Sequence, residues 1–295
     1  MEKVYLSDVG PKVSPAIYGF WRWNEYGKAG IDGMEKMVNL CLELGINTFD
    51  HADIYGEYQC EALFGEVMSR KSFRREDIVL FSKCGINLPH ASRPQFRTVH
   101  NNTSAKHIEQ SVEQSLKNLR TDYLDVFLLD TLDPLSNIEE TALSLDRLKS
   151  SGKIRHVGVS NFSVFQHQLL ASILKSPIST SHIELNVLNT SALDNGQIDY
   201  IKQRYMRPLA TAPLAGGRIE NGTDEKAVRV RKKLLEISKK YNSNIESTAV
   251  AWLIKLGALP LIGTENENRI RNIVNAFQID MDHQDWYELY NESRI

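Results

Sequence analysis

Short apolar runs alternate with longer amphipathic segments along almost the whole chain. Eight of the short runs have the length and the residue types of buried β-strands. They are residues 16–20, 46–50, 78–82, 125–129, 156–159, 182–185, 208–212 and 260–262. Strands that alternate with helices form a parallel sheet, because each helix returns the chain to the starting end of the next strand.

The segments between these runs carry apolar residues at spacings of three and four, which is typical of amphipathic helices. In residues 34–44, for example, Met34, Met37 and Cys41 share one stripe, and Gly45 follows, a usual residue after a helix end. The other expected helices are 61–69, 104–119, 137–149, 164–173, 195–204, 225–239 and 268–277. Two further helical stretches, 246–256 and 283–291, exceed the eight-fold pattern, and we interpret them as insertions around the last unit.

Eight strand–helix units favour a closed (β/α)8 barrel, the TIM barrel of the α/β class, over an open nucleotide-binding sheet. Such an open sheet has a G-x-G-x-x-G turn after its first strand, and residues 18–22 (YGFWR) lack it. Residues 3–6 and 12–13 flank a turn and predict an N-terminal β-hairpin that plugs the barrel floor. We expect a single domain over residues 1–295, because no linker divides the chain.

Composition narrows the classes of partner. The 295 residues are 42% hydrophobic and 24% charged, with a net charge of −2, so we expect neither nucleic acid nor a membrane as a partner. No signal peptide or long apolar run is present, and a cytoplasmic location is expected. The three cysteines suit neither a disulfide framework nor a metal site. A closed barrel has no exposed sheet edge, which favours a monomer or a weak homo-oligomer.

Reactive groups in such barrels lie at the carboxyl ends of the strands. Asp50 ends the second expected strand and Lys83 the third, while Tyr55 follows closely after Asp50. If the side chains of Asp50 and Lys83 both face the mouth of the barrel, they can form an ion pair. The buried ammonium would lower the pKa of Tyr55, and this phenol could then act as a general acid toward a carbonyl. The alternative, open on spacing alone, is a structural ion pair at the barrel rim with Tyr55 packing beside it.

Four ordered motifs carry a family resemblance. They are residues 49–56 (FDHADIYG), 153–162 (KIRHVGVSNF), 212–217 (APLAGG) and 262–270 (IGTENENRI). Together they resemble the aldo-keto reductase family, from about residue 4 to the carboxyl terminus. The resemblance implies reduction of a carbonyl by NADPH, with the proton supplied by the tyrosine. It makes Asp50, Tyr55 and Lys83 three members of a catalytic tetrad.

The resemblance also implies a cofactor site for NADP(H). Ser160 and Asn161 would hydrogen-bond the nicotinamide carboxamide, and His182 stands where the family usually has glutamine beside that group. The pyrophosphate would be wrapped by Leu214, Gly216 and Gly217, and the 2′-phosphate held by Thr264 and Arg269. Taken alone, Arg269 reads more simply as a solvated arginine on a helix.

The fourth tetrad member departs from the family. The family has a histidine at the end of the fourth strand, and this chain has Asp130. A neutral histidine donates a hydrogen bond to a substrate oxygen, whereas an ionised aspartate cannot. Burial beside Asp50 would favour a protonated Asp130 that donates, and related steroid double-bond reductases carry a glutamate there. Otherwise carbonyl reduction is weak or lost.

Two further departures lie near the nicotinamide: His182 replaces a glutamine, and Thr211 stands where a stacking aromatic residue is common. These changes predict altered chemistry or an altered position of the ring. His51 should point away from the barrel interior, in a structural role. The polar loop 87–103 is expected to line the substrate mouth, and Trp21 and Trp23 either form an apolar wall there or pack in the core.

Three functions follow from these residues. The leading hypothesis is an NADP(H)-dependent oxidoreductase that reduces a small carbonyl or an activated C=C bond, with Tyr55 as proton donor and Asp130 in the tetrad. The alternative is a nucleotide-binding sensor or partner-binding protein with little turnover, for which the family's potassium-channel β subunits are a precedent. A Schiff-base lyase using Lys83 is disfavoured, because pairing with Asp50 would keep the amine protonated.

Overall fold

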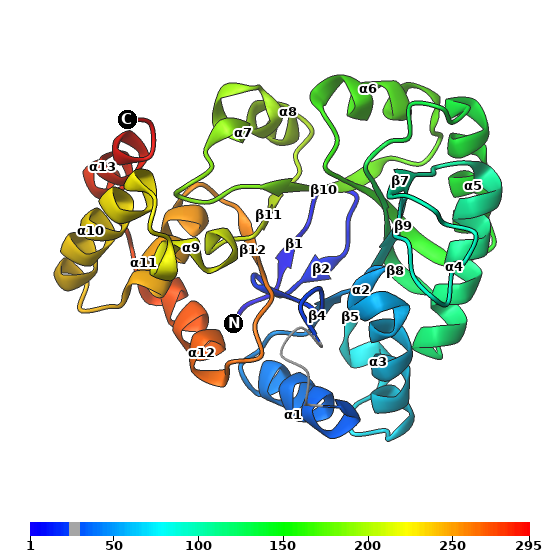
Figure 1. Ribbon diagram of the computed structural model, residues 1–295, viewed down its shortest axis with the longest axis horizontal. Helices are drawn as coiled ribbons and strands as arrows, with labels where there is room; N and C mark the ends of the chain where they lie inside the picture. The colour runs from blue at the N-terminus through cyan, green and yellow to red at the C-terminus, as the bar shows by residue number, and fades with distance from the viewer. Residues whose placement is uncertain (24–29) are drawn as a thin grey trace.

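The computed structural model describes residues 1–23 and 30–295, and its centre is a closed barrel of eight parallel strands (Figure 1). Around the barrel the strands are β3 (Ile17–Gly19), β4 (Thr48–Asp50), β5 (Val79–Cys84), β8 (Leu124–Asp130), β9 (Ile154–Ser160), β10 (Ile178–Glu184), β11 (Pro208–Thr211) and β12 (Leu259–Ile262). All eight expected strands are confirmed. The strand β10 begins four residues before its expected start, because Ser179, Thr180 and Ser181 are polar yet buried.

Helices surround the strands (Figure 1). They are α1 (Gly30–Glu43), α2 (Tyr55–Tyr58), α3 (Cys60–Ser69), α4 (Ala105–Leu119), α5 (Ile138–Ser150), α6 (Val164–Ile173), α7 (Ser191–Asp194), α8 (Gln197–Gln203), α9 (Arg218–Asn221), α10 (Glu225–Lys240), α11 (Ile245–Lys255), α12 (Glu267–Asn275) and α13 (His283–Glu292). Side-chain caps begin several of them, as with Ser104 at α4 and Asn266 at α12. The expected helix 195–204 is α8, and the short helix α7 precedes it, separated from it by a turn in which Gly196 has a φ of 83°.

The helix between β11 and β12 that packs on the barrel is α11, not α10. Every residue of α11 from Ser247 to Leu253 is buried, and the helix contacts β12 and α12. The helix α10 packs on α9, α11 and α13, and lies with α13 outside α11 in Figure 1. Two extra helices near the carboxyl terminus are therefore present, but the interpretation of 246–256 as one of them is wrong. In the described part of the chain, no helix is long and apolar enough to cross a membrane.

The barrel interior is a packed apolar core that is closed at one end by the predicted hairpin. The strands β1 (Val4–Tyr5) and β2 (Lys12–Val13) pair antiparallel and lie at the centre of the ring in Figure 1. Leu6 and Val13 are fully buried against the inward-facing side chains of the barrel strands. Those side chains are Ile17, Phe81, Val126, Leu128, Leu209, Leu259 and Leu261. Because the hairpin fills the floor, open space is left at the carboxyl ends of the strands.

We expect Gly65→Ala to destabilise the protein, although alanine usually stabilises a helix by about 1 kcal/mol over glycine. A Cβ on Gly65 would overlap the backbone carbonyl oxygen of Asn118, so α3 and α4 would have to separate. Overpacking of this kind costs about 1–3 kcal/mol, which should appear as a lower free energy of unfolding in urea. The control is Gly152→Ala. There a φ of 77° strains the backbone, but no atom of another element lies within 4 Å of the added Cβ. A neutral or stabilising Gly65→Ala would contradict the close helix approach.

Candidate active site

Lys83 and Asp50 form a buried ion pair at the carboxyl ends of the neighbouring strands β5 and β4. The Lys83 Nζ lies 2.6 Å from Asp50 Oδ2, and the side chains are 4% and 0% exposed. Lys83 also donates to the His51 carbonyl oxygen at 3.0 Å. His51 itself stacks on Phe20 in the layer between strands and helices, as its predicted structural role requires.

Tyr55 begins α2 and lies against the same ammonium. The Lys83 Nζ is 4.6 Å from the centre of the Tyr55 ring. Burial raises the pKa of the Tyr55 phenol above its ordinary value, while Lys83 acts in the opposite direction. The expected lowering by Lys83 is thus present, but burial outweighs it, so the pKa of Tyr55 is raised overall. The phenol holds its proton at neutral pH.

The charge of Lys83 is also settled by its neighbours. Burial alone lowers the pKa of this ammonium, but Asp50, Tyr55 and Asp130 together raise it above its ordinary value. Lys83 therefore stays protonated, as the argument against a Schiff-base lyase required. Burial raises the pKa of Asp50, and the contact with Lys83 opposes this shift.

Asp130 ends β8 beside the ion pair and is 8% exposed. Its Oδ1 accepts a hydrogen bond of 2.8 Å from the Nδ2 of Asn161, which directly follows β9. Its charge acts on Tyr55, Lys83 and Asp50, so the structure brings all four predicted tetrad positions together. Asn161 has a φ of 59°, a left-handed conformation that asparagine tolerates better than most residues.

His182 lies inside the barrel, on β10, in register with Ser160 of β9. Its ring is fully buried, 6.4 Å from that of Phe81, and neither ring nitrogen has a hydrogen-bond partner among the described residues. Burial, with a smaller effect of Lys83, lowers the pKa of His182 well below its ordinary range, so the ring is neutral. A neutral imidazole can both donate and accept, which suits a carboxamide.

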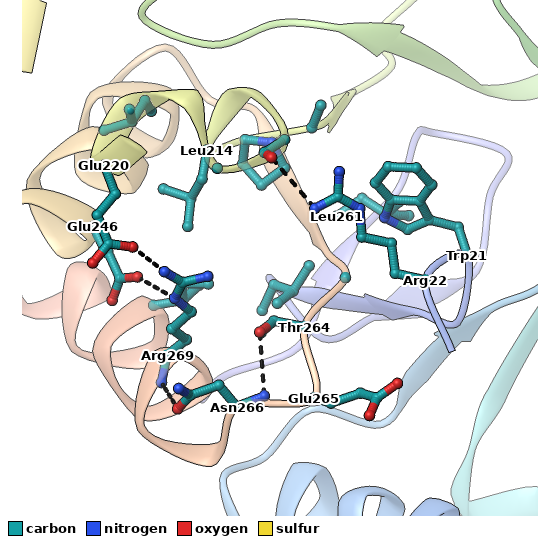
Figure 2. A pocket seen from close by; sticks show the side chains of 18 residues that line it. Trp21, Arg22, Leu214, Glu220, Glu246, Leu261, Thr264, Glu265, Asn266 and Arg269 are labelled. Atoms are coloured by element: carbon teal, nitrogen blue, oxygen red, sulfur yellow. Dashed lines mark hydrogen bonds and ion pairs between the residues drawn. The ribbon is translucent and has the colours of Figure 1, made fainter. Parts of the chain in front are cut away.

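A cleft of about 420 Å³ opens at the carboxyl ends of β3, β11 and β12, the end of the barrel that also carries the ion pair (Figure 2). It is lined by the residues after β3, the loop after β11, helix α9 and the segment from β12 into α12. Leu214, Gly216, Gly217, Thr264 and Arg269 all line it, so the residues predicted for the phosphates share one cavity.

The loop after β11 meets only part of its expectation. The amides of Ala215 and Gly217 donate to the carbonyl oxygens of Ala212 and Leu214, so these two N–H groups are engaged within the loop itself. Gly217 has a φ of 93°, and no atom lies within 4 Å of the place where a Cβ would stand. Bare backbone therefore borders open space here, as a pyrophosphate cradle requires.

Three residues at the cleft were not predicted from the sequence. Arg22 stacks on the Trp21 ring at 4.3 Å and donates to the Gly216 carbonyl oxygen at 3.3 Å, which joins the two walls of the cleft. Glu220 and Glu246 pair with Arg269. Their positions far apart in the sequence gave no signal for this. Trp21 lines this cleft, and its predicted place in a wall of the substrate mouth stays a prediction, whereas Trp23 is 3% exposed and packs on Phe20 in the core.

The polar loop 87–103 contains a short antiparallel pair, β6 (Ile86–Asn87) and β7 (His100–Asn101). Its start is fixed to α2, because the Tyr58 hydroxyl bonds both the N–H and the C=O of Leu88. The loop therefore begins beside the helix that carries Tyr55. Its role at a substrate mouth stays a prediction.

These residues fit a nicotinamide dinucleotide. Around the ion pair lie unpartnered buried acceptors and donors, namely Asp50 Oδ1 and both nitrogens of His182. The cleft at the same end of the barrel offers exposed glycine backbone and the Arg269 guanidinium. An extended ligand with an amide-bearing ring and a phosphate-bearing end matches these groups.

Comparison with known proteins agrees with this geometry. The model of the aldo/keto reductase family matches residues 16–291. "Uncharacterized oxidoreductase YcsN" of Bacillus subtilis is 37% identical over 293 residues, 98% of this chain and 97% of that protein. A 6-dehydroglucose reductase of Agrobacterium fabrum is 36% identical, over 98% of this chain and 97% of that protein. The thermostable aldo-keto reductase Tm1743 shares the fold, with a TM-score of 0.84 at 23% identity, over 99% of this chain and all of that chain.

The chain therefore belongs to the aldo-keto reductase family and is an oxidoreductase. The family generally uses a nicotinamide cofactor and acts on small carbonyl compounds.

Asp53, behind the tetrad, should make stability depend on pH. Burial and the nearby Glu61 raise the pKa of Asp53 to about 8, against a hydrogen bond from Ser111. Between about pH 4 and pH 8 the folded protein keeps a proton that the unfolded chain has lost. The contribution of Asp53 to stability is therefore full below pH 4 and falls as pH rises, by at most about 1.4 kcal/mol per unit.

We expect Asp53→Asn to remove part of this fall, so the variant gains on the wild type between pH 5 and pH 8 in urea unfolding. The exposed Asp8→Asn serves as the control and should follow the wild type. An Asp53→Asn profile parallel to that of the wild type would show that Asp53 is ionised in the folded state throughout.

Proposed function

We propose that this protein reduces a small carbonyl compound, or an activated C=C bond, with NADP(H) as its cofactor. The observation that carries the proposal is the buried Lys83–Asp50 pair against Tyr55, at the same end of the barrel as a cleft that suits a dinucleotide. When bound, the nicotinamide supplies the hydride, and the protein supplies the proton donor and the charges that stabilise its anion.

Tyr55 is the proposed proton donor. Its phenol is protonated at neutral pH, and the ammonium of Lys83 stabilises negative charge on the Tyr55 oxygen as the proton leaves. Asp50 keeps Lys83 charged and in place through the 2.6 Å contact. Proton transfer at Tyr55 is thus favoured when the substrate oxygen gains charge.

Asp130 would act through its second oxygen. Because Asn161 donates to Oδ1, that oxygen is an acceptor, and a proton on the carboxyl group belongs on Oδ2. A protonated Oδ2 can donate to the substrate oxygen, which is the task of histidine in the family. An ionised Asp130 would oppose charge on that oxygen and weaken carbonyl reduction.

The remaining predicted residues would hold the cofactor. Ser160, Asn161 and His182 are the proposed contacts of the carboxamide, and the loop with Leu214, Gly216 and Gly217 is the proposed contact of the pyrophosphate. Thr264 and Arg269 are the proposed contacts of the 2′-phosphate, which is the reason for proposing NADP(H).

The relatives help to choose substrates for testing. The Agrobacterium relative, and a Novosphingobium aromaticivorans relative that is 32% identical, are both named 6-dehydroglucose reductase. We therefore include sugar aldehydes among the candidate substrates.

A cytoplasmic location also stays a proposal. Cys41, Cys60 and Cys84 are free and buried, as in a reducing compartment.

Stopped-flow mixing of the NADPH-bound protein with aldehyde and enone panels tests this function. Tyr55→Phe should slow nicotinamide oxidation by about 100-fold or more, because it removes the proton donor. Tyr205→Phe, at an exposed tyrosine, is the matched control and should keep the wild-type rate. Unchanged turnover in Tyr55→Phe would refute the assignment of the donor.

Asp130→His tests whether Asp130 limits carbonyl reduction. Histidine restores a neutral donor, so aldehyde turnover should rise by about tenfold or more if Asp130 limits carbonyl reduction. Absence of turnover in both the wild type and Asp130→His, with the cofactor bound, would favour a nucleotide-binding sensor instead.

A further inference from the structure

Arg269 lines the cleft at the place where residues of three helices meet. The arginine belongs to α12, Glu220 to α9 and Glu246 to α11, and Figure 2 shows both carboxylates directed at the guanidinium. Thr264 and the backbone after β12 complete this part of the wall.

The two carboxylates occupy different edges of the guanidinium. Glu246 Oε1 lies 2.8 Å from Arg269 Nε, and Glu220 pairs with Nη2. Glu246 is held in place, because Asn272 Nδ2 donates to its other oxygen at 2.8 Å and its side chain is only 13% exposed. Glu220 is 48% exposed and can turn toward water.

The charge of the lining is unusual for a site that receives several phosphates. The described lining residues include two cations, Arg22 and Arg269, and three carboxylates, Glu220, Glu246 and Glu265. Arg22 lies on the opposite wall, over Trp21 and against the Gly216 carbonyl oxygen. Arg269 is thus the cation on this wall of the cleft among the described lining residues, and it already has two anionic partners.

We propose that Glu220 and Glu246 set the choice of cofactor, by competing with the 2′-phosphate for Arg269, so that NADH binds about as tightly as NADPH. This proposal rests on the function proposed above, namely that the cleft holds a nicotinamide dinucleotide. A phosphate monoester brings between one and two negative charges next to both carboxylates. NADH brings a hydroxyl group instead, which donates well to a carboxylate.

The two glutamates should differ in strength. To engage a phosphate, Arg269 must release a carboxylate, and a carboxylate that stays nearby repels the ligand. Glu220 can swing into solvent, whereas Glu246 is fixed by Asn272 and would remain as an unpaired, largely buried charge. Replacement of Glu246 should therefore improve NADPH binding more than replacement of Glu220.

Titration of the intact protein with NADPH and with NADH tests the proposal, with quenching of tryptophan fluorescence as the readout, since Trp21 lines the cleft. For the wild type we expect dissociation constants within about fivefold of each other. Glu220→Gln and Glu246→Gln should tighten NADPH binding while NADH binding stays the same or weakens. The ratio of the NADH to the NADPH constant should rise about threefold or more, most in Glu246→Gln and the double variant.

Glu267→Gln is the matched control, because this glutamate lies on the same helix but pairs with Lys36. Its ratio should equal that of the wild type. A rise of less than threefold in both single variants and in the double variant overturns the proposal, while binding of both cofactors leaves the proposed function standing. If the wild type binds neither NADPH nor NADH, this proposal and the proposed function are both overturned. NADH binding by each variant also shows that its cleft is folded.

Discussion

The ion pair between Lys83 and Asp50 organises the open end of this barrel. Placing both charges in the protein interior is costly, because each loses its hydration. The contact of 2.6 Å, the bond to the His51 carbonyl oxygen and the face of Tyr55 offset that cost. Removing one partner would leave a buried charge and cost about 3–5 kcal/mol. The barrel therefore maintains a fixed positive charge beside a phenol, at the one end that the hairpin leaves open.

Competing interactions decide the state of both the tetrad positions and Arg269. Burial raises the pKa of Tyr55 and Lys83 opposes this shift, so in the proposed function Lys83 favours loss of the proton as charge develops on the phenol oxygen. In the proposed function, Asp130 assists reduction only if its carboxyl group can donate a hydrogen bond. At Arg269, two carboxylates already satisfy the cation before any phosphate arrives. A cation that lines the cleft therefore does not by itself predict phosphate binding, because Arg269 already has two anionic partners.

Much of the architecture could be predicted from the sequence. Barrel strands are buried on both faces, so their apolar runs are visible, and Asp50, Lys83 and Asp130 stand out because each is a polar residue ending such a run. The start of β10 could not be seen, because Ser179, Thr180 and Ser181 are polar residues buried by the fold.

Other features depend on tertiary packing. The packing of α11 on the barrel, the depth at which Tyr55 lies and the meeting of Glu220 and Glu246 at Arg269 all involve distant segments. The roles of the site residues and the division of the chain into one domain stay predictions.

The pH dependence of a single turnover tests whether Lys83 acts on a protonated Tyr55. The rate of nicotinamide oxidation by an aldehyde would be followed by stopped flow from pH 6 to pH 9, in wild type and in Lys83→Met. Because burial raises the pKa of Tyr55, the wild-type rate should not decline with loss of the phenol proton in this range, and Lys83→Met should be slower at every pH. A wild-type rate that falls with an inflection near pH 7, or a Lys83→Met variant as fast as the wild type, would contradict the account.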